Sequence, residues 1–186
     1  MSQLQGMPLV NIKRVEIITE EDTPKTYTWE TADKAKVSPE ISKGKETTLR
    51  IKDVIYANNR TEDIVIGYNL EFQDNMFIPQ VFALIDGGTL TFDEDDATKV
   101  TAYEGPEIGV VVKRTKFTLN VYTEEKDVDG ETLKYAKFIY KHCKGKPAEY
   151  DIEDGKFMVP KLKMESRPKK GEKPVKIEFV DTLPAA

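Results

Sequence analysis

The stretch Ile64–Phe72 alternates apolar and polar residues more regularly than any other part of the sequence. Its apolar members fall at every second position and are Ile64, Ile66, Tyr68, Leu70 and Phe72. A side-chain period of two is the period of a β-strand with one buried face. We therefore predict a strand here, with these five side chains in the core. A slip of one residue would expose all of them, so the pattern also fixes the register.

Similar alternation recurs along the chain and predicts a mainly β protein. Further strands are expected around Leu49/Ile51, Phe117/Leu119/Val121 and Val175/Ile177/Phe179, and with less regular phase over 10–18, 133–140 and 157–163. Several short strands separated by turn residues are typical of a β-sandwich or barrel of antiparallel strands. A chain of 186 residues can form this as one domain, 1–186.

Turn residues, one helix and two loops complete the expected organisation. Asp129-Gly130 and Asp154-Gly155 lie between extended segments and predict two hairpins. A short flanking α-helix is predicted over Pro79–Ile85, because proline suits a first helical turn and Asp86-Gly87-Gly88 suits its end. The polar stretches 32–45 and 166–174 are interpreted as loops.

Composition excludes several classes of protein. The net charge of -5 argues against a general nucleic-acid-binding surface, which needs clustered Lys and Arg. Cys143 is the one cysteine, so no disulfide forms within the chain, which suits a reducing cytoplasm. The segment Met1–Pro8 lacks signal-peptide character and no apolar run reaches membrane-spanning length, so we expect neither export by that route nor a membrane partner.

The sequence offers little catalytic chemistry. The one histidine and the one cysteine are neighbours, His142-Cys143, and adjacent side chains on a strand point to opposite faces. We interpret them as a buried thiol beside a surface histidine instead of a nucleophile and its base. The glycine-rich phosphate-binding motifs GxxxxGK[ST] and GxGxxG are missing from the sequence. We expect no enzyme and no cofactor.

Two acidic clusters could in principle bind a hard cation. They are Asp93–Asp96 and the group Asp127, Asp129 and Glu131. Neither has the spacing of an EF-hand loop. We interpret the first as a solvated loop and the second as a hairpin tip, and we expect no metal.

Charge is unevenly distributed along the chain. Residues 62–107 carry eleven acids and one base, whereas residues 156–176 carry eight bases and two acids. Three readings of the basic segment stay open: a nucleic-acid contact, a solvated surface, or a contact between copies of the chain in which acidic and basic regions meet.

Several segments resemble tail-tube proteins of bacteriophages and of phage-tail-like particles of Gram-positive bacteria. The resemblance lies in residues 68–75, 81–91, 112–119, 144–148, 165–168 and 177–181, and it covers roughly residues 60 to 182. It implies a β-sandwich with one flanking helix, assembled as hexameric rings that stack into a hollow tube for DNA. It also implies partner proteins such as the tape measure, tail terminator and distal tail proteins. The protein would be made in the host bacterial cytoplasm and would lie in the virion tail.

The tube interpretation predicts which residues meet the lumen and the neighbouring subunit. The polar face of this strand, opposite Leu70, carries Asn69 and Glu71 and has no base of its own. Without a base to hold phosphates, DNA would slide over it. We therefore predict that Asn69 and Glu71 line the lumen. The polar loop 32–45, with Lys36, Val37 and Ile41, is predicted to order against a neighbour on assembly. The alternative function is a non-enzymatic β-sandwich binding module, such as a surface or solute-binding domain.

Overall fold

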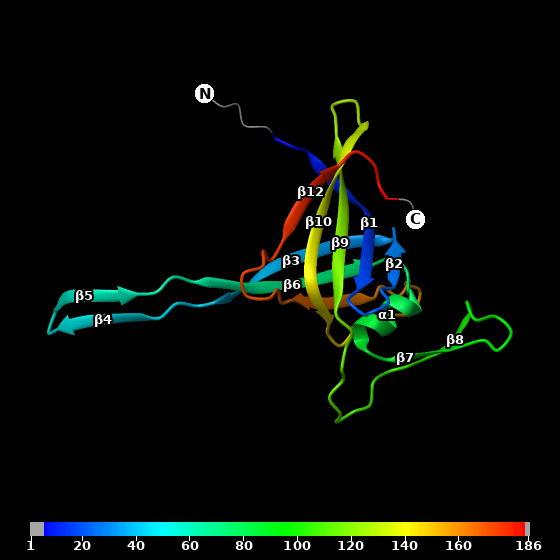
Figure 1. Cartoon of the computed structure of the whole chain (residues 1–186), viewed down its shortest axis with the longest axis horizontal. Helices are drawn as coiled ribbons and strands as arrows, with labels where there is room; N and C mark the ends of the chain where they lie inside the picture. The colour runs from blue at the N-terminus through cyan, green and yellow to red at the C-terminus, as the bar shows by residue number, and fades with distance from the viewer. Residues whose placement is uncertain (1–5, 185–186) are drawn as a thin grey trace.

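The structure is a computed structural model that describes residues 6–184, with a mainly β backbone (Figure 1). Most of the segment considered for a signal peptide, residues 1–5, lies outside this range. The elements in chain order are β1 (Leu9–Thr19), β2 (Thr26–Trp29), β3 (Ala32–Ser42), β4 (Glu46–Ile51), β5 (Val54–Arg60), β6 (Ile64–Asp74), α1 (Pro79–Asp86), β7 (Thr89–Phe92), β8 (Val100–Glu104), β9 (Phe117–Lys126), β10 (Thr132–Gly145), β11 (Lys161–Ser166) and β12 (Lys176–Val180).

Eight strands form one antiparallel sheet that folds over into two layers. Its order is β2-β1-β9-β10-β11-β6-β3, with β12 also paired to β10. β10 belongs to both layers, because Tyr135–Ile139 pair with β12 and Cys143–Gly145 pair with β11. Figure 1 shows β3 and β6 crossing β1, β9 and β10 at a steep angle. The fold is therefore the predicted antiparallel β-sandwich with one short flanking helix.

A β-bulge in β10 lets this strand turn from one layer into the other. The register with β9 shifts between Tyr140 and Cys143, and His142 within the bulge has a positive φ of 53°. Bulges bend a strand and increase its local twist.

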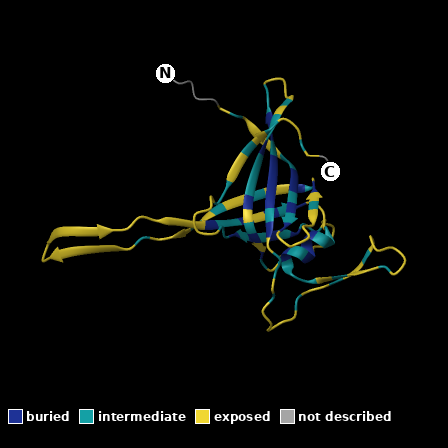
Figure 2. Ribbon diagram, in the orientation of Figure 1, coloured by how far each residue is buried: buried dark blue, intermediate teal, exposed yellow. Residues whose placement is uncertain are grey.

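Apolar side chains from both layers meet between the sheets. The first layer contributes Val15, Ile17, Phe117, Leu119, Val121 and Tyr140, and the second contributes Leu70, Phe72, Leu162 and Met164. Figure 2 shows the buried residues concentrated in the sandwich and the helix beside it. Phe117, Leu119 and Val121 are buried as predicted, but burial does not alternate along this strand, because Asn120 and Tyr122 are buried as well.

Helix α1 confirms the predicted helix and closes one end of the core. Pro79 begins it, and Gly87 ends it in the left-handed conformation (φ 87°) while donating its N–H to the carbonyl of Ala83. Glycine has no Cβ to oppose that conformation. The helix buries Val81, Phe82 and Ile85.

Two hairpins project from the sandwich. One, formed by β4 and β5, extends far from the body, and every residue of both strands is exposed (Figures 1 and 2). We call residues 46–60 the arm. The other is formed by β7 and β8 and points away on the opposite side in the same view.

The interpretation of residues 32–45 as a loop is wrong. Residues 32–42 form β3, which pairs with β6 from Ala32 to Ser42. Ala35 and Val37 face inward, whereas Lys34 and Lys36 share the polar face with Glu71 and Gln73. The alternation of Lys34, Ala35, Lys36 and Val37 is typical of a strand. The many charges and Pro39 favoured a loop instead, although an edge strand tolerates proline.

The core prediction for Ile64–Phe72 holds only for its second half. Leu70 and Phe72 are buried and Tyr68 is partly buried, but Ile64 and Ile66 are exposed. The reason is that pairing with β11 begins at Tyr68, while the start of β6 pairs with β3 beyond the edge of the other layer. Leu49, Ile51, Ile177 and Phe179 likewise lie on strands but are exposed.

One predicted hairpin is confirmed and the other is not. Asp129-Gly130 forms the turn between β9 and β10, where Gly130 has φ 84°. Gly155 also has positive φ, but its flanks are irregular and share one isolated bridge, Glu149 to Lys161. β11 accordingly begins at Lys161 instead of residue 157. Residues 167–175 form the predicted second loop.

Glu124 is a buried carboxylate at the base of the β9–β10 hairpin. Asn11 Nδ2 donates to its Oε1 (2.6 Å), Thr132 Oγ1 donates to its Oε2 (2.7 Å), and the Nζ atoms of Lys126 and Lys13 lie 3.3 and 3.8 Å away. The hydrogen bond from Asn11, followed by those from Thr132 and Lys126, lowers the pKa of Glu124 from 4.5 to about 2.

Glu124→Gln should therefore change how stability depends on pH. A carboxylate with a lowered pKa stabilises the folded state above pH 4.5, and this contribution is lost as the pH falls toward about 2. At about pH 7 the free energy of unfolding of wild type should exceed that of the variant, and this difference should decrease below pH 4.5. Denaturant unfolding across this range measures the gap. A gap that does not change with pH would contradict the lowered pKa.

Candidate assembly surfaces

The face predicted to line the lumen is surrounded by lysines. Asn69 and Glu71 lie on the polar face of β6, with Leu70 and Phe72 on the opposite face. Directly paired residues share a face. Register partners from β3 and β11 on this face are Lys34, Lys36, Ser38, Lys161, Lys163 and Glu165. β6 itself supplies no base to this face, as expected, but the neighbouring strands β3 and β11 place lysines beside it.

Acidic side chains neutralise part of this polar face. Ion pairs join Lys146 to Glu165 (3.2 Å), Lys161 to Asp151 (3.0 Å) and Lys163 to Glu149 (2.7 Å). Separately, the acidic segment 62–107 and the basic segment 156–176 meet within one subunit where β6 pairs with β11, with Lys163 beside Glu71. Within residues 6–184, no ion pair involves Lys34 or Lys36.

Lys36, Val37 and Ile41, predicted to contact a neighbour, lie on an edge strand. β3 ends the sheet order, and in the described part of the chain it pairs with β6 alone. Its outer backbone groups are free to pair with another chain. Lys36 belongs to the polar face, while Val37 and Ile41 are exposed apolar residues. The structure thus places all three where a neighbour could add a strand.

An apolar hollow lies beside β3 between the two layers. Its volume is about 330 Å³, and it is lined by Ile12, Ala35, Val37, Val121, Thr123, Phe138 and Tyr140. Ile177, which pairs with Phe138, and Phe179 extend the same apolar face along β12 and are exposed. Contiguous exposed apolar surface is typical of an interaction site.

The arm carries large apolar side chains that nothing in its own subunit covers. These are Leu49, Ile51, Val54, Ile55 and Tyr56, each more than half exposed. Its root is held firmly: Thr61 donates its N–H to the carbonyl of Lys45 (2.9 Å), and Asp63 Oδ1 accepts from the N–H of Gly44 (2.8 Å). An isolated two-stranded hairpin is marginally stable in water, so this arm needs a partner surface.

The His142-Cys143 pair is split by the bulge. Cys143 is buried, as predicted, and burial raises the pKa of its thiol to about 12. His142 is only partly exposed, and its Nδ1 is 2.6 Å from Glu20 and its Nε2 is 3.1 Å from Glu172. The ring thus links the end of β1 to the loop before β12. Sequence reasoning missed this cluster because its members are far apart in the chain.

The acidic clusters occupy the predicted loops. Asp93–Asp96 form the tip of the β7–β8 hairpin, and Asp127 accepts the N–H groups of Asp129 and Glu131 in the β9–β10 turn. Among the described residues, no group of three His, Cys, Asp or Glu side chains is arranged to hold a metal ion. In residues 6–184, no helix combines the length and the hydropathy needed to cross a membrane.

Comparisons with known proteins give little guidance. No protein-family model matches the sequence, and no curated protein matches it. Among solved structures, the chain is similar to a chain in the 6-fold symmetrised cryo-EM structure of the anti-feeding prophage (AFP) baseplate. The TM-score is 0.42 at 8% sequence identity, over 96% of this chain and 97% of that one. A TM-score and an identity this low do not identify a family.

Proposed function

We propose that this chain is a non-enzymatic structural subunit of a phage-like tail tube, which forms hexameric rings that stack into a conduit for DNA. The observation that carries the proposal is the arm, which exposes apolar side chains on a firmly held stem. The sequence resemblance to tail-tube proteins supports the choice of assembly. Tape measure, tail terminator and distal tail proteins would be its partners in the virion tail.

The arm has the properties of an element that is completed by another copy. Two exposed strands with five large apolar residues stand apart from the sandwich (Figure 2). Their burial against a second subunit would contribute about 25 cal/mol for each Å² of apolar surface removed from water. Because the arm is far from its own core, it can reach a neighbour without changing the fold of its own subunit.

The sandwich offers acceptor surfaces of matching character. The free edge of β3 can pair with a strand, and the hollow beside it presents Val37 and Phe138 to apolar side chains. Edge pairing and apolar burial together favour a repeated contact between identical subunits. The alternative function, a binding module, does not explain the exposed apolar arm or the free edge of β3.

Asn69 and Glu71 remain our proposed lumen residues. Ion pairs hold Lys146, Lys161 and Lys163 in place on this face, so these lysines are less available to phosphates than free ones. Lys34 and Lys36 form no ion pair within residues 6–184, so they are the cationic side chains of this face that DNA in the lumen would contact.

Light scattering coupled to size exclusion, followed by negative-stain microscopy of the full chain, tests the proposed function. Rings or tubes of uniform diameter are the expected result. A monomer that persists at high protein concentration would overturn the proposal and favour the binding module.

Removing the arm should abolish tube formation without unfolding the subunit. Residues 46–60 are replaced by Asn-Gly, because Lys45 and Thr61 already pair and this dipeptide suits a two-residue hairpin turn. The thermal midpoint should stay close to that of wild type, while microscopy should show no tubes.

Point variants that keep the arm test whether its apolar side chains are needed for assembly. Leu49→Ser together with Tyr56→Ser should weaken assembly, since both side chains are exposed in the free subunit. Phe157→Ser, which changes an even more exposed apolar residue outside the arm, serves as the control. Normal tubes from the armless chain would contradict the role given to the arm.

A further inference from the structure

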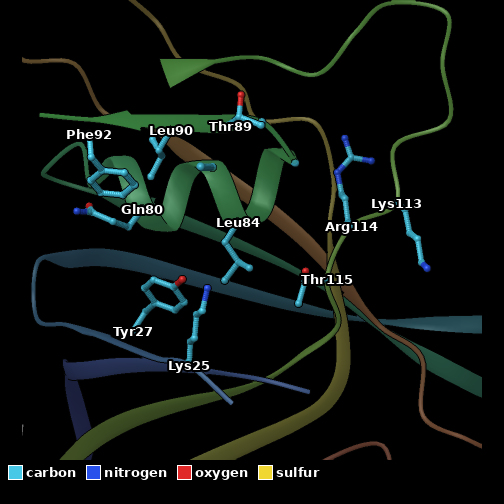
Figure 3. Close-up of a pocket in the computed structure, with 13 residues that line it drawn as sticks. Lys25, Tyr27, Gln80, Leu84, Thr89, Leu90, Phe92, Lys113, Arg114 and Thr115 are labelled. Atoms are coloured by element: carbon cyan, nitrogen blue, oxygen red, sulfur yellow. The ribbon is translucent and has the colours of Figure 1, made fainter. Parts of the chain in front are cut away.

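A basic hollow lies beside α1, apart from the arm and the edge of β3. Its volume is about 460 Å³, and Figure 3 shows the residues around it. The helix contributes Gln80 and Leu84, β7 contributes Leu90 and Phe92, and the opposite walls come from the segments around Lys25 and Arg114. In Figure 3 Lys25 and Arg114 flank the helix from different sides.

The hollow has three cationic side chains and no carboxylate among its lining residues. The cations are Lys25, Lys113 and Arg114, and none of them forms an ion pair within residues 6–184. Arg114 Nε donates to the backbone carbonyl of Asp86 (3.0 Å), which fixes the guanidinium beside the helix end. Two acids lie nearby: Glu21 accepts a hydrogen bond from Thr115 at the rim (3.3 Å), and the Asp86 carboxylate accepts from the Tyr103 hydroxyl and the N–H of Ala148. The hollow is therefore suited to an anionic ligand.

The tip of the β7–β8 hairpin supplies an anionic ligand from the same sequence. Residues 93–99 contain four acids and one base, Lys99, so their net charge is -3, opposite to the three cations of the hollow. Hydrogen bonds from backbone N–H groups and from Thr98 lower the pKa of Asp93 and Asp96, so both are ionised at neutral pH. Glu94 and Asp95 at the tip are exposed.

The tip does not reach the hollow of its own subunit. β7 lines the hollow as far as Phe92, but residues 93–99 beyond it are not among the lining residues, and the hairpin projects from the body (Figure 1). One subunit therefore carries an acidic tip and a basic hollow that do not contact each other.

We propose that the acidic tip, residues 93–99, inserts into the basic hollow of the neighbouring copy. This inference rests on the proposed function, because it assigns one contact of the ring. The two surfaces differ, so the contact is heterologous, and a heterologous contact generates a ring when its rotation closes. Opposite charges at the two surfaces set the register of neighbouring subunits and exclude other contacts.

A nucleic acid is a less suitable occupant of this hollow. Affinity for a phosphate backbone grows with the number of phosphates neutralised, and three cations give a weak site. The hollow is also partly apolar, through Leu84, Leu90 and Phe92, whereas a phosphate chain offers no apolar partner.

Charge reversal on each surface tests the contact in the full chain. A tip variant carries Glu94→Lys and Asp95→Lys, and a hollow variant carries Lys25→Glu and Lys113→Glu. Each alone should raise the protein concentration needed for ring formation by about tenfold or more. Mixed in equal amounts, the two should assemble again, because alternating subunits restore opposite charges at every contact of an even-numbered ring.

Control variants carry a single charge reversal of the same sign elsewhere. Lys173→Glu alters an exposed lysine outside the hollow, and Glu131→Lys alters the tip of the β9–β10 hairpin. Both should assemble as wild type does. Raising the salt concentration should weaken assembly of wild type more than that of a chain carrying Lys25→Ala and Lys113→Ala.

The outcomes separate this inference from the proposed function. Normal rings from both reversal variants would overturn the contact and leave the tube proposal standing. Wild type that stays monomeric would overturn both. Normal rings combined with DNA binding that is lost in the hollow variant would assign the hollow to nucleic acid and overturn the contact between copies.

Discussion

Replacing Leu70 with alanine should lower the free energy of unfolding of the isolated subunit by about 2–5 kcal/mol. Leu70 is 2% exposed and lies in β6 between its register partners Val37 in β3 and Met164 in β11. Truncation removes buried methyl groups and leaves a cavity, because three paired strands cannot close around it without breaking their hydrogen bonds. Urea unfolding with an unchanged slope measures the loss.

Ile64→Ala is the matched control on the same strand. Ile64 is 64% exposed, so in the isolated subunit its truncation should change stability by no more than about 0.5 kcal/mol. Equal losses of unfolding free energy for Leu70→Ala and Ile64→Ala would mean that the start of β6 is buried as well. An unchanged unfolding midpoint for Leu70→Ala would contradict the position of β6 in the core.

Gly145→Ala should destabilise the subunit by about 3 kcal/mol, the upper end of the usual cost of overpacking. Gly145 ends β10 and pairs with Met164 of β11. A Cβ at this position would lie 2.0 Å from the carbonyl oxygen of Ile85 and 2.6 Å from its carbonyl carbon. These are backbone atoms of α1, which cannot rotate away as a side chain can, so the helix itself must move.

Displacement of α1 by Gly145→Ala should have a second measurable effect. Ile85 and Phe82 pack into the core from the helix, so a shift should expose both in addition to lowering the thermal midpoint. Amide exchange over residues 79–86 should become faster in the variant. Gly105→Ala is the control, because nothing lies within 4 Å of a Cβ there. A Gly145→Ala subunit as stable as this control would show that α1 does not contact β10 closely.

Sequence patterns anticipated the elements whose cause is local. Alternation predicted the strand that contains Phe117–Val121, and the spacing of Pro79 and Gly87 predicted α1. Asp129-Gly130 predicted the β9–β10 turn, because a positive φ is a property of the residue itself. Each of these signals involves neighbours in the chain.

The assembly surfaces depend on contacts that no short segment contains. The lysines beside Glu71 come from β3 and β11, so a single strand could not reveal the charge of that face. The basic hollow joins Lys25 to Arg114, and the histidine cluster joins Glu20 to His142. The acidic tip was visible as a run of charge, but its use depends on a hollow formed elsewhere in the chain.

By itself, the sequence determined that the chain forms antiparallel strands with one short helix, because period, turn residues and helix ends act over a few residues. Only the tertiary structure decided which apolar faces are buried. Leu70 and Ile64 belong to one strand, yet the first layer covers Leu70, whereas a register shift between β3 and β6 changes the alternation before Ile64, which is exposed. Leu49 and Tyr56 obey the same rules of strand formation and remain exposed on the arm. Periodicity tells which side chains point the same way, and burial depends on whether another part of the chain lies opposite them.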